Sequence, residues 1–249
     1  MRGISIVISS GDSGAHGRTD DGCAKTATLP DWPTASPYIL AVGASQLVDG
    51  APLPAPKSPL CKTSPAGVHP CAGSGTEVVC SPATGALIAS GGGFSTVAAT
   101  PPWQAAAVKA YIAVPGAVPP AKDYNATGRG YPDVAALGHQ YPILAQSRWV
   151  NVDGTSCSAP VFGGIIGLAN AARLEAGKKV LGFLAPAIYA IAAKKGGAFT
   201  DVTKGDNKCT EQGCKPGCTG FEATAGWDAT TGWGTPKVVE LIRELVALP

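Results

Sequence analysis

The sequence predicts an α/β fold with a mainly parallel sheet. Short β-branched runs that end in turns alternate along the chain with longer apolar runs at helical spacing, which is the pattern of this fold class. The 249 residues, of which 45% are hydrophobic and 14% charged, suffice for the core of one large domain. The 33 glycines and 22 prolines predict numerous long loops between these elements.

Two β-branched runs are expected to be buried strands, because each stops abruptly at a turn. ISIVISS ends at the sequence GDSG, and PYILAVGAS has the same character. PDVAAL and YPILAQ are also strand-like. We therefore expect strands at 4–10, 37–45, 132–137 and 141–146.

Four other runs favour helices. PPWQAAAVKAYIA begins with prolines, which suit a first helical turn, and continues with good helix formers. The apolar run around 159–174 is too long for one strand and has Pro160 near its start. At the end of the chain, Val238, Leu241, Ile242 and Leu245 have helical spacing. The expected helices cover about 103–113, 159–174, 181–195 and 236–248.

A segment rich in proline, glycine and serine interrupts this alternation. It lacks hydrophobic periodicity between Asp49 and Gly75. We expect a loop-rich surface insertion over about 46–85.

Charge and hydropathy exclude two classes of partner. The formal net charge is +2, and the 19 basic and 17 acidic residues are scattered, so no footprint for nucleic acid is visible. No window holds the roughly 18–20 uninterrupted apolar residues that span a bilayer, and the first residues do not form a signal peptide. Neither a nucleic-acid partner nor a membrane span is expected.

Eight cysteines are many for a reducing compartment. Cys209, Cys214 and Cys218 lie within ten residues of loop sequence, where disulfides are the first interpretation and a zinc site the alternative. Asn125 begins the glycosylation sequence NAT. Both features favour a lysosomal or vacuolar location, or secretion.

Ser156 is the candidate nucleophile. It lies in the stretch NVDGTSCSAP, in a tight turn before an apolar helix, where free backbone N–H groups favour negative charge. That position suits acyl transfer. The alternative is that Gly154, Thr155 and Ser156 only form a turn that caps the helix.

Six segments, in order, resemble the sedolisins, the serine-carboxyl peptidases, and most closely their tripeptidyl peptidase branch. GTSCSAP resembles the nucleophile segment that subtilisin-like peptidases and sedolisins share. The other segments are SSGDSGA at 9–15, GGGFS at 91–95, YPDVAA at 131–136, GFLAPAIYAI and AGWDATTGWGTP. The resemblance implies a subtilisin-like sheet flanked by helices. It implies that 1–249 is the later part of a sedolisin catalytic domain, apparently without its N-terminal portion and propeptide.

The resemblance assigns Asp12 as the donor to the oxyanion. Subtilisins have an asparagine in this role, whereas sedolisins have the aspartate of S-G-D-S-G. An ionised carboxylate has no proton to donate, so Asp12 can act only when it is protonated. By the same resemblance, Gly91, Gly92 and Gly93 line the substrate cleft together with the turn of Gly154 and Thr155, since glycine lets a peptide approach closely.

The family's base is a glutamate that is linked to an aspartate, and both lie upstream of S-G-D-S-G. The preceding residues, MRGISIVI, contain neither. Asp20, Asp21, Asp31, Glu77 and Asp123 match no family base. A triad built on His16 is disfavoured, because subtilisin-like order puts the histidine before the oxyanion residue, and His69 and His139 are expected on the surface.

A calcium site and a set of disulfides also follow from the resemblance, in the Cys-rich loop region of about 199–236. The matched calcium ligands are the carboxylates of Asp201 and Asp228 and the backbone oxygens of Val202, Thr224 and Gly226, a set of oxygens that suits Ca²⁺. Cys23 is expected to pair with one of Cys209, Cys214 and Cys218. From the residues themselves, Cys61, Cys71 and Cys80 are expected to pair among themselves, and Cys157 is expected to be free and not catalytic.

The sequence therefore predicts an acid serine peptidase, either an endopeptidase or a tripeptidyl peptidase, that acts on peptide or protein substrates. Two alternatives stay open. One is an inactive peptide-binding relative, or a fragment that lacks the base. The other is a subtilisin-like peptidase, or an α/β domain in which GTS is only a helix cap.

Overall fold

A four-stranded sheet forms the centre of the computed structural model, which describes residues 3–48, 75–194 and 197–249. Strand β2 (Leu40–Val48) pairs in parallel with β1 (Val7–Ser9) and with β6 (Val134–Leu137), and antiparallel with β3 (Thr76–Val79). Val42 is opposite both Ser9 and Val134, whereas Ser45 is opposite both Val79 and Leu137. Strands β1 and β3 therefore follow each other along one edge of β2, and β6 occupies the other edge.

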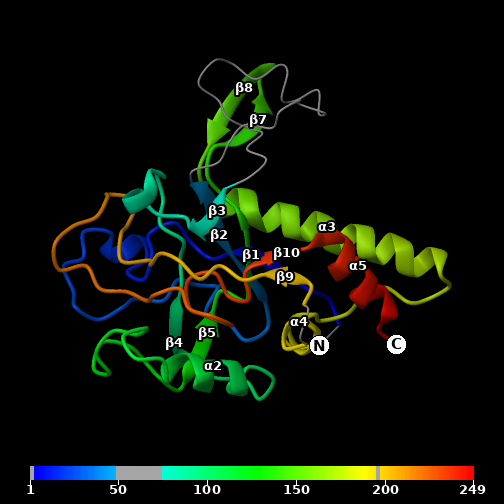
Figure 1. Ribbon diagram of the computed structural model, residues 1–249, viewed down its shortest axis with the longest axis horizontal. Helices are drawn as coiled ribbons and strands as arrows, with labels where there is room; N and C mark the ends of the chain where they lie inside the picture. Colours follow the sequence, from blue (N-terminus) through cyan, green and yellow to red (C-terminus); the bar gives the residue numbers. More distant parts are fainter. Residues whose placement is uncertain (1–2, 49–74, 195–196) are drawn as a thin grey trace.

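Helix α3 (Thr155–Glu175) covers one face of this sheet. It contacts β1, β2 and β6, and α5 (Val238–Ala247) lies alongside it (Figure 1). Helix α4 (Ala185–Ala192) joins the same core, which includes Leu40, Val134, Phe162 and Leu241. The buried face of α3 thus fixes the start of the helix relative to the carboxyl ends of the parallel strands.

A second, largely aromatic core packs against α2 (Ala105–Ile112). It contains Phe94, Tyr111, Phe221 and Trp227. Phe94 belongs to β4 (Gly93–Ala99), which pairs antiparallel with β5 (Gly128–Tyr131). Near the carboxyl end of the chain, β9 (Phe199–Thr200) pairs with β10 (Thr235–Pro236).

A hairpin projects away from the body of the protein, above the start of α3 in Figure 1. Its strands are β7 (Tyr141–Ala145) and β8 (Arg148–Val152), which are antiparallel, with Tyr141 opposite Val152. Val152 leads directly into the turn before α3. The base of the hairpin is therefore fixed next to Ser156.

The predicted fold class is confirmed, and three boundaries are corrected. Helix α3 begins at Thr155 and not at 159, because Pro160 lies in its second turn and not at its start. The predicted insertion at 46–85 is too wide, since β2 continues to Val48 and the short helices and strands resume at Thr76, with a 3₁₀ turn at Pro82–Thr84. Pairing with β2 supplies hydrogen bonds to a segment that has little periodicity of its own.

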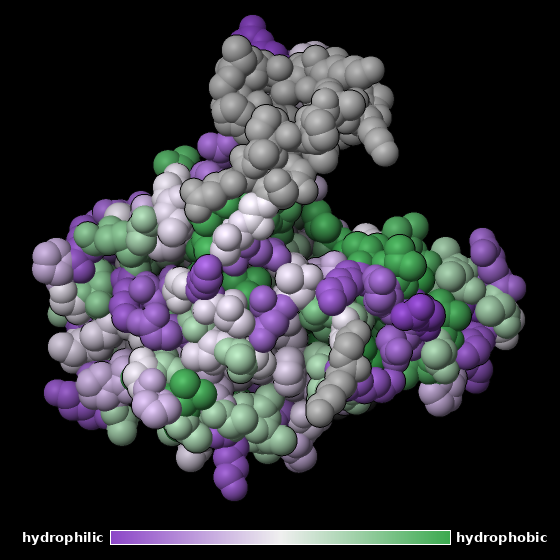
Figure 2. Space-filling model, viewed as in Figure 1, coloured by the Kyte–Doolittle hydropathy of each residue, from purple (hydrophilic) through white to green (hydrophobic). Residues whose placement is uncertain are grey.

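Helix α3 is the one described helix long and apolar enough, by length and composition, to cross a membrane. Its most apolar window has a mean hydropathy of 1.2, and 39% of that window is buried inside the fold. Figure 2 shows hydrophobic surface gathered over this part of the protein, where Leu168 and Leu174 are exposed. Core helices meet the same criteria, and the packing of α3 against the sheet is that of a core helix.

Candidate active site

Ser156 is the second residue of α3 and is exposed. The turn before it is held by backbone hydrogen bonds: the Gly154 N–H donates to the Gly138 carbonyl at 2.8 Å, and the Cys157 N–H donates to the Gly154 carbonyl at 3.0 Å. Among the described residues, none forms a hydrogen bond with the Ser156 hydroxyl. A rigid turn thus presents a free hydroxyl at a helix N-terminus, where backbone N–H groups stabilise developing negative charge.

Asp12 lies immediately beside this turn. It follows β1, is 8% exposed, and its Oδ1 accepts hydrogen bonds from the backbone N–H and the hydroxyl of Thr155, each at 2.8 Å. The Thr155 hydroxyl in turn accepts from the Gly11 N–H at 3.2 Å. The structure therefore brings together the two residues that the sequence singles out for catalysis, although their chemical roles stay predictions.

The other carboxylate oxygen of Asp12 faces a cation. Arg18 donates to Asp12 Oδ2 at 3.3 Å and to Glu211 Oε1 at 2.7 Å. All of these groups donate to Asp12, which in this arrangement acts only as an acceptor. A proton on Asp12 would have to reside on Oδ2, the oxygen not bonded to Thr155, for the carboxyl to donate to an oxyanion.

The three glycines of GGGFS are buried: Gly91 and Gly92 lie against the chain's own backbone, and Gly93 lies against the Phe221 side chain. The Gly91 N–H donates to the Gly11 carbonyl at 2.8 Å, and a Cβ on Gly92 would overlap the Ala229 carbonyl. Glycine is thus required there for close approach of protein segments. That Gly91, Gly92 and Gly93 also line the substrate cleft stays a prediction.

Neither described histidine bonds with Ser156. His16 is fully buried and bonds with Asp20 at 3.0 Å and with the backbone of Thr219, which is consistent with the prediction that it forms no triad. His139 was expected on the surface, but only 17% of its side chain is exposed, because it bonds with Asp153 Oδ2 at 2.7 Å. His69 lies outside the described residues.

Asp31 is another carboxylate near Asp12. Burial raises its pKa above the ordinary value, although the neighbouring Arg18 opposes this shift. A Cβ added to Gly11 would overlap the Asp31 carboxylate, which shows how closely Asp31 packs under the Asp12 loop. This packing makes Asp31 a structural neighbour of the loop that carries Asp12, and no hydrogen bond links Asp31 to Ser156 among the described residues.

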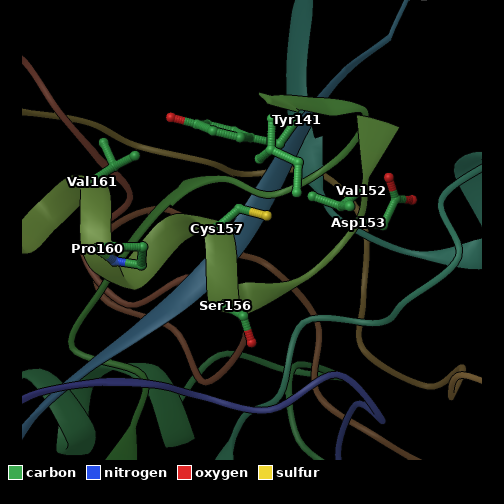
Figure 3. Close-up of a pocket in the computed structure, with 8 residues that line it drawn as sticks. Tyr141, Val152, Asp153, Ser156, Cys157, Pro160 and Val161 are labelled. Carbon is green, nitrogen blue, oxygen red and sulfur yellow. The ribbon is translucent and has the colours of Figure 1, made fainter. Parts of the chain in front are cut away.

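A cavity of about 580 Å³, which the sequence analysis did not predict, opens beside Ser156 (Figure 3). Helix α3 provides one wall of it and the hairpin β7–β8 the other. Burial, together with the charges of Asp12 and Asp153, raises the pKa of the Cys157 thiol in this cavity. Cys157 is free, as the sequence predicts.

The predicted calcium ligands gather at one turn. Asp201 Oδ2 accepts from the Gly226 N–H at 2.8 Å, and Asp228 Oδ2 accepts from the Thr224 N–H at 3.1 Å. Asp228 is fully buried, and burial raises its pKa to about 7 despite hydrogen bonds from Thr230, Thr231 and Thr224.

The chemistry of this turn fits a hard cation. Among the described residues, the buried Thr224 hydroxyl has no hydrogen-bond partner, and no cationic side chain pairs with the Asp228 carboxylate. The described residues hold no cluster of three or more His, Cys, Asp or Glu side chains, so a cation here would depend on two carboxylates and on backbone oxygens. Calcium accepts that set, and its binding stays a prediction.

Two disulfides are present among the described residues. Cys23 pairs with Cys218, which identifies the partner that the sequence left open, and Cys209 pairs with Cys214. Cys80 is free and buried beside Ala44 and Ile88, so it takes no part in the pairing expected among Cys61, Cys71 and Cys80. Cys61 and Cys71 lie outside the described residues.

Comparisons with known proteins give relatives that match almost the whole chain. No family model matches the chain. Physarolisin from Physarum polycephalum is 43% identical over 252 residues, a match that covers 99% of this chain and 42% of physarolisin. Tripeptidyl-peptidase 1 from Canis lupus familiaris is 36% identical over 253 residues, covering 98% of this chain and 38% of that protein. The chain thus spans about two fifths of the length of these curated relatives.

A solved structure matches as well. Pseudomonas sedolisin, a serine-carboxyl proteinase complexed with two molecules of pseudo-iodotyrostatin, aligns with a TM-score of 0.65 and 27% sequence identity. The alignment covers 96% of this chain and 54% of the sedolisin chain.

Proposed function

Because the chain belongs to the sedolisin family of serine-carboxyl peptidases, we propose that it carries the nucleophile and the oxyanion donor of an acid serine peptidase. The observation that supports this most directly is the pair of hydrogen bonds between Asp12 and Thr155, the residue before Ser156. A sedolisin-type site needs this aspartate and this serine next to each other, and a simple helix cap does not.

In this mechanism the Ser156 hydroxyl attacks the carbonyl carbon of a peptide bond. The carbonyl oxygen becomes an oxyanion close to the first turn of α3, where free N–H groups of the helix and a protonated Asp12 stabilise it. A protonated carboxyl donates a hydrogen bond, whereas an ionised one would repel the oxyanion. Acid pH is therefore the condition under which this pair of residues works.

The base that removes the Ser156 proton is not assigned to this chain. In the family it is a glutamate upstream of S-G-D-S-G, and no carboxylate among the described residues is hydrogen-bonded to Ser156. A peptide-binding relative without catalysis is the alternative function.

Calcium and the cell compartment are further parts of the proposal. Asp201, Asp228 and the backbone oxygens of Val202, Thr224 and Gly226 would hold the ion, whose role is to neutralise the buried Asp228 carboxylate and fix the loop. The two disulfides favour an oxidising or exported location, either lysosomal or vacuolar or outside the cell.

The test is hydrolysis of an unstructured protein such as casein at about pH 4, compared with neutral pH. The chain alone should show little or no activity. The same chain extended by the upstream family sequence should be active, and Ser156→Ala should abolish that activity. An extended protein that binds peptides but hydrolyses none at any pH would contradict the enzyme and support the binding protein.

A further inference from the structure

The cavity beside Ser156 has two apolar walls. The first two turns of α3 contribute Cys157, Pro160 and Val161, and the hairpin β7–β8 contributes Tyr141, Ile143 and Val152 (Figure 3). Its volume of about 580 Å³ is within the range of roughly 300–1,000 Å³ that holds small ligands. The cavity can therefore accept a large side chain.

The polar groups of the cavity leave no charge free for a ligand. Asp153 lies in its lining, but Oδ2 binds His139 and the Leu87 N–H and Oδ1 binds the Gln140 N–H, all at 2.7 Å. Burial disfavours the ionised form of Asp153, yet these hydrogen bonds lower its pKa below the ordinary value. The Cys157 thiol, whose pKa burial raises, stays protonated and behaves as a small apolar group.

Ser156 forms the edge of the cavity, and its hydroxyl points away from Tyr141 and Val152 in Figure 3. Asp12 does not line the cavity. The Ser156 hydroxyl thus points away from these two residues of the apolar wall, and Asp12 bonds with Thr155, the residue before Ser156. In an extended peptide, successive residues are about 3.3 Å apart and their side chains point to opposite faces. A side chain close to the reacting bond would therefore reach the cavity while the carbonyl faces Asp12.

A second cavity extends this surface. It has a volume of about 340 Å³, shares Tyr141 and Val161 with the first, and continues to Leu47 and Leu137 on the sheet. Because the two cavities share these residues, they form one continuous surface that extends from the hairpin to the sheet.

We propose that the cavity between α3 and the hairpin is a specificity pocket for an apolar side chain of the peptide, and that Ile143 and Val161 determine this preference. The inference rests on the proposed function, because it takes the occupant to be part of the substrate that reaches Ser156. Ile143 and Val161 lie on opposite walls, so each can be changed without altering Ser156 or Asp12.

The test is binding of two short polyalanine peptides that differ in one central residue, Phe or Asn. Methyl NMR signals of Ile143, Val152 and Val161 are followed during titration of the full chain. The Phe peptide should shift these signals saturably and slow the alkylation of Cys157 by iodoacetamide. The Asn peptide should bind at least about tenfold more weakly than the Phe peptide, since an apolar pocket discriminates between side chains by roughly 10- to 200-fold.

Variants separate the pocket from general effects on the surface. Ile143→Asp and Val161→Asp should each remove the preference for Phe, and Ile143→Val should keep it. Leu168→Asp, on an exposed part of α3 that does not line the cavity, is the matched control and should behave as wild type. Should Asp at 161 prevent folding, as judged by circular dichroism, Val161→Phe replaces it and should block the Phe peptide by filling the space.

Equal binding of the two peptides, unmoved Ile143 and Val161 signals, or the same loss in Leu168→Asp would each overturn the proposal. The measurement does not depend on turnover, and Ser156→Ala should keep the preference. A retained preference for Phe in an extended protein that hydrolyses nothing would contradict the peptidase function and leave the pocket standing.

Discussion

Asp12 Oδ1 accepts two hydrogen bonds from Thr155, one from its backbone N–H and one from its hydroxyl, each at 2.8 Å. These bonds join the loop after β1 to the first residue of α3, which are 143 positions apart in the sequence. The Gly11 N–H completes the junction by donating to the same hydroxyl. Asp12, the predicted oxyanion donor, and the turn that carries Ser156, the predicted nucleophile, are therefore positioned as one unit.

Replacing Thr155 by valine should weaken this unit. Thr155→Val removes a hydroxyl that both donates and accepts, and leaves the Gly11 N–H without that partner. We expect a loss of about 1–3 kcal/mol in the free energy of unfolding, measured by urea denaturation. Thr155→Ser retains the hydroxyl and should lose less than half as much. Equal losses in the two variants would show that the hydroxyl is not what stabilises the junction.

Two glycines should respond to alanine in opposite directions. Gly92→Ala places a methyl group against the Ala229 carbonyl and should destabilise the protein by about 1–3 kcal/mol or more. Gly163 lies inside α3 with open space at its Cβ position, so Gly163→Ala should stabilise the protein by about 0.5–1 kcal/mol. Thermal unfolding of the two variants measures both effects, and a stabilised Gly92→Ala would refute the close packing of GGGFS.

Helices with a clear apolar face could be predicted from the sequence. Helix α2 was expected over 103–113 and is found at Ala105–Ile112, because its alanines and spaced apolar residues favour helix locally. The strands β4, β5 and β8 could not be predicted in this way. Strand β4 pairs with β5 through an irregular register, and such pairing depends on contacts between distant segments.

The hairpin β7–β8 shows why the cavity beside Ser156 could not be predicted from the sequence. Its turn consists of Gln146 and Ser147, with φ of 49° and 61°, whereas the usual residues for such φ values are glycine, asparagine and aspartate. The motifs around Ser156 and Asp12 predict the catalytic residues, but they contain no information on which strand lies opposite α3. The cavity exists only because Tyr141 pairs with Val152.

The two disulfides should differ in their contribution to stability. Cys23–Cys218 closes a loop across 195 positions, whereas Cys209–Cys214 closes one across 5. Cross-links over longer loops restrict the unfolded chain more, with typical contributions of about 2–4 kcal/mol. The double variant Cys23→Ala/Cys218→Ala should therefore lose more stability than Cys209→Ala/Cys214→Ala in denaturant titrations. The reverse order would mean that strain or local structure outweighs loop closure here.

Calcium should raise the melting temperature if the turn around Asp228 binds it. A ligand at a hundred times its dissociation constant stabilises the native state by about 2.7 kcal/mol. Asp228→Asn should abolish the effect of calcium, and Glu175→Gln, at the exposed end of α3, should leave it intact. Differential scanning calorimetry with and without a chelator measures this. Identical melting curves for the wild-type chain in calcium and in chelator would refute the site.

Asp153 should stabilise the protein in a pH-dependent way. Burial opposes its ionisation, but hydrogen bonds from the Leu87 and Gln140 N–H groups and from His139 lower its pKa below the ordinary value of about 3.9. A carboxyl with a lowered pKa in the folded state contributes stability above its unfolded pKa, and this contribution is lost as the pH falls through the folded value. Asp153→Asn should therefore cost about 1–3 kcal/mol near pH 6, and progressively less as the pH falls below about 3.

Asp21→Asn is the matched control, since the Asp21 carboxylate makes no hydrogen bond with the described residues, and it should change stability little at either pH. An Asp153→Asn penalty that is the same near pH 6 and near pH 2.5 would show that the ionised carboxylate does not hold the base of the hairpin against the loop at Leu87.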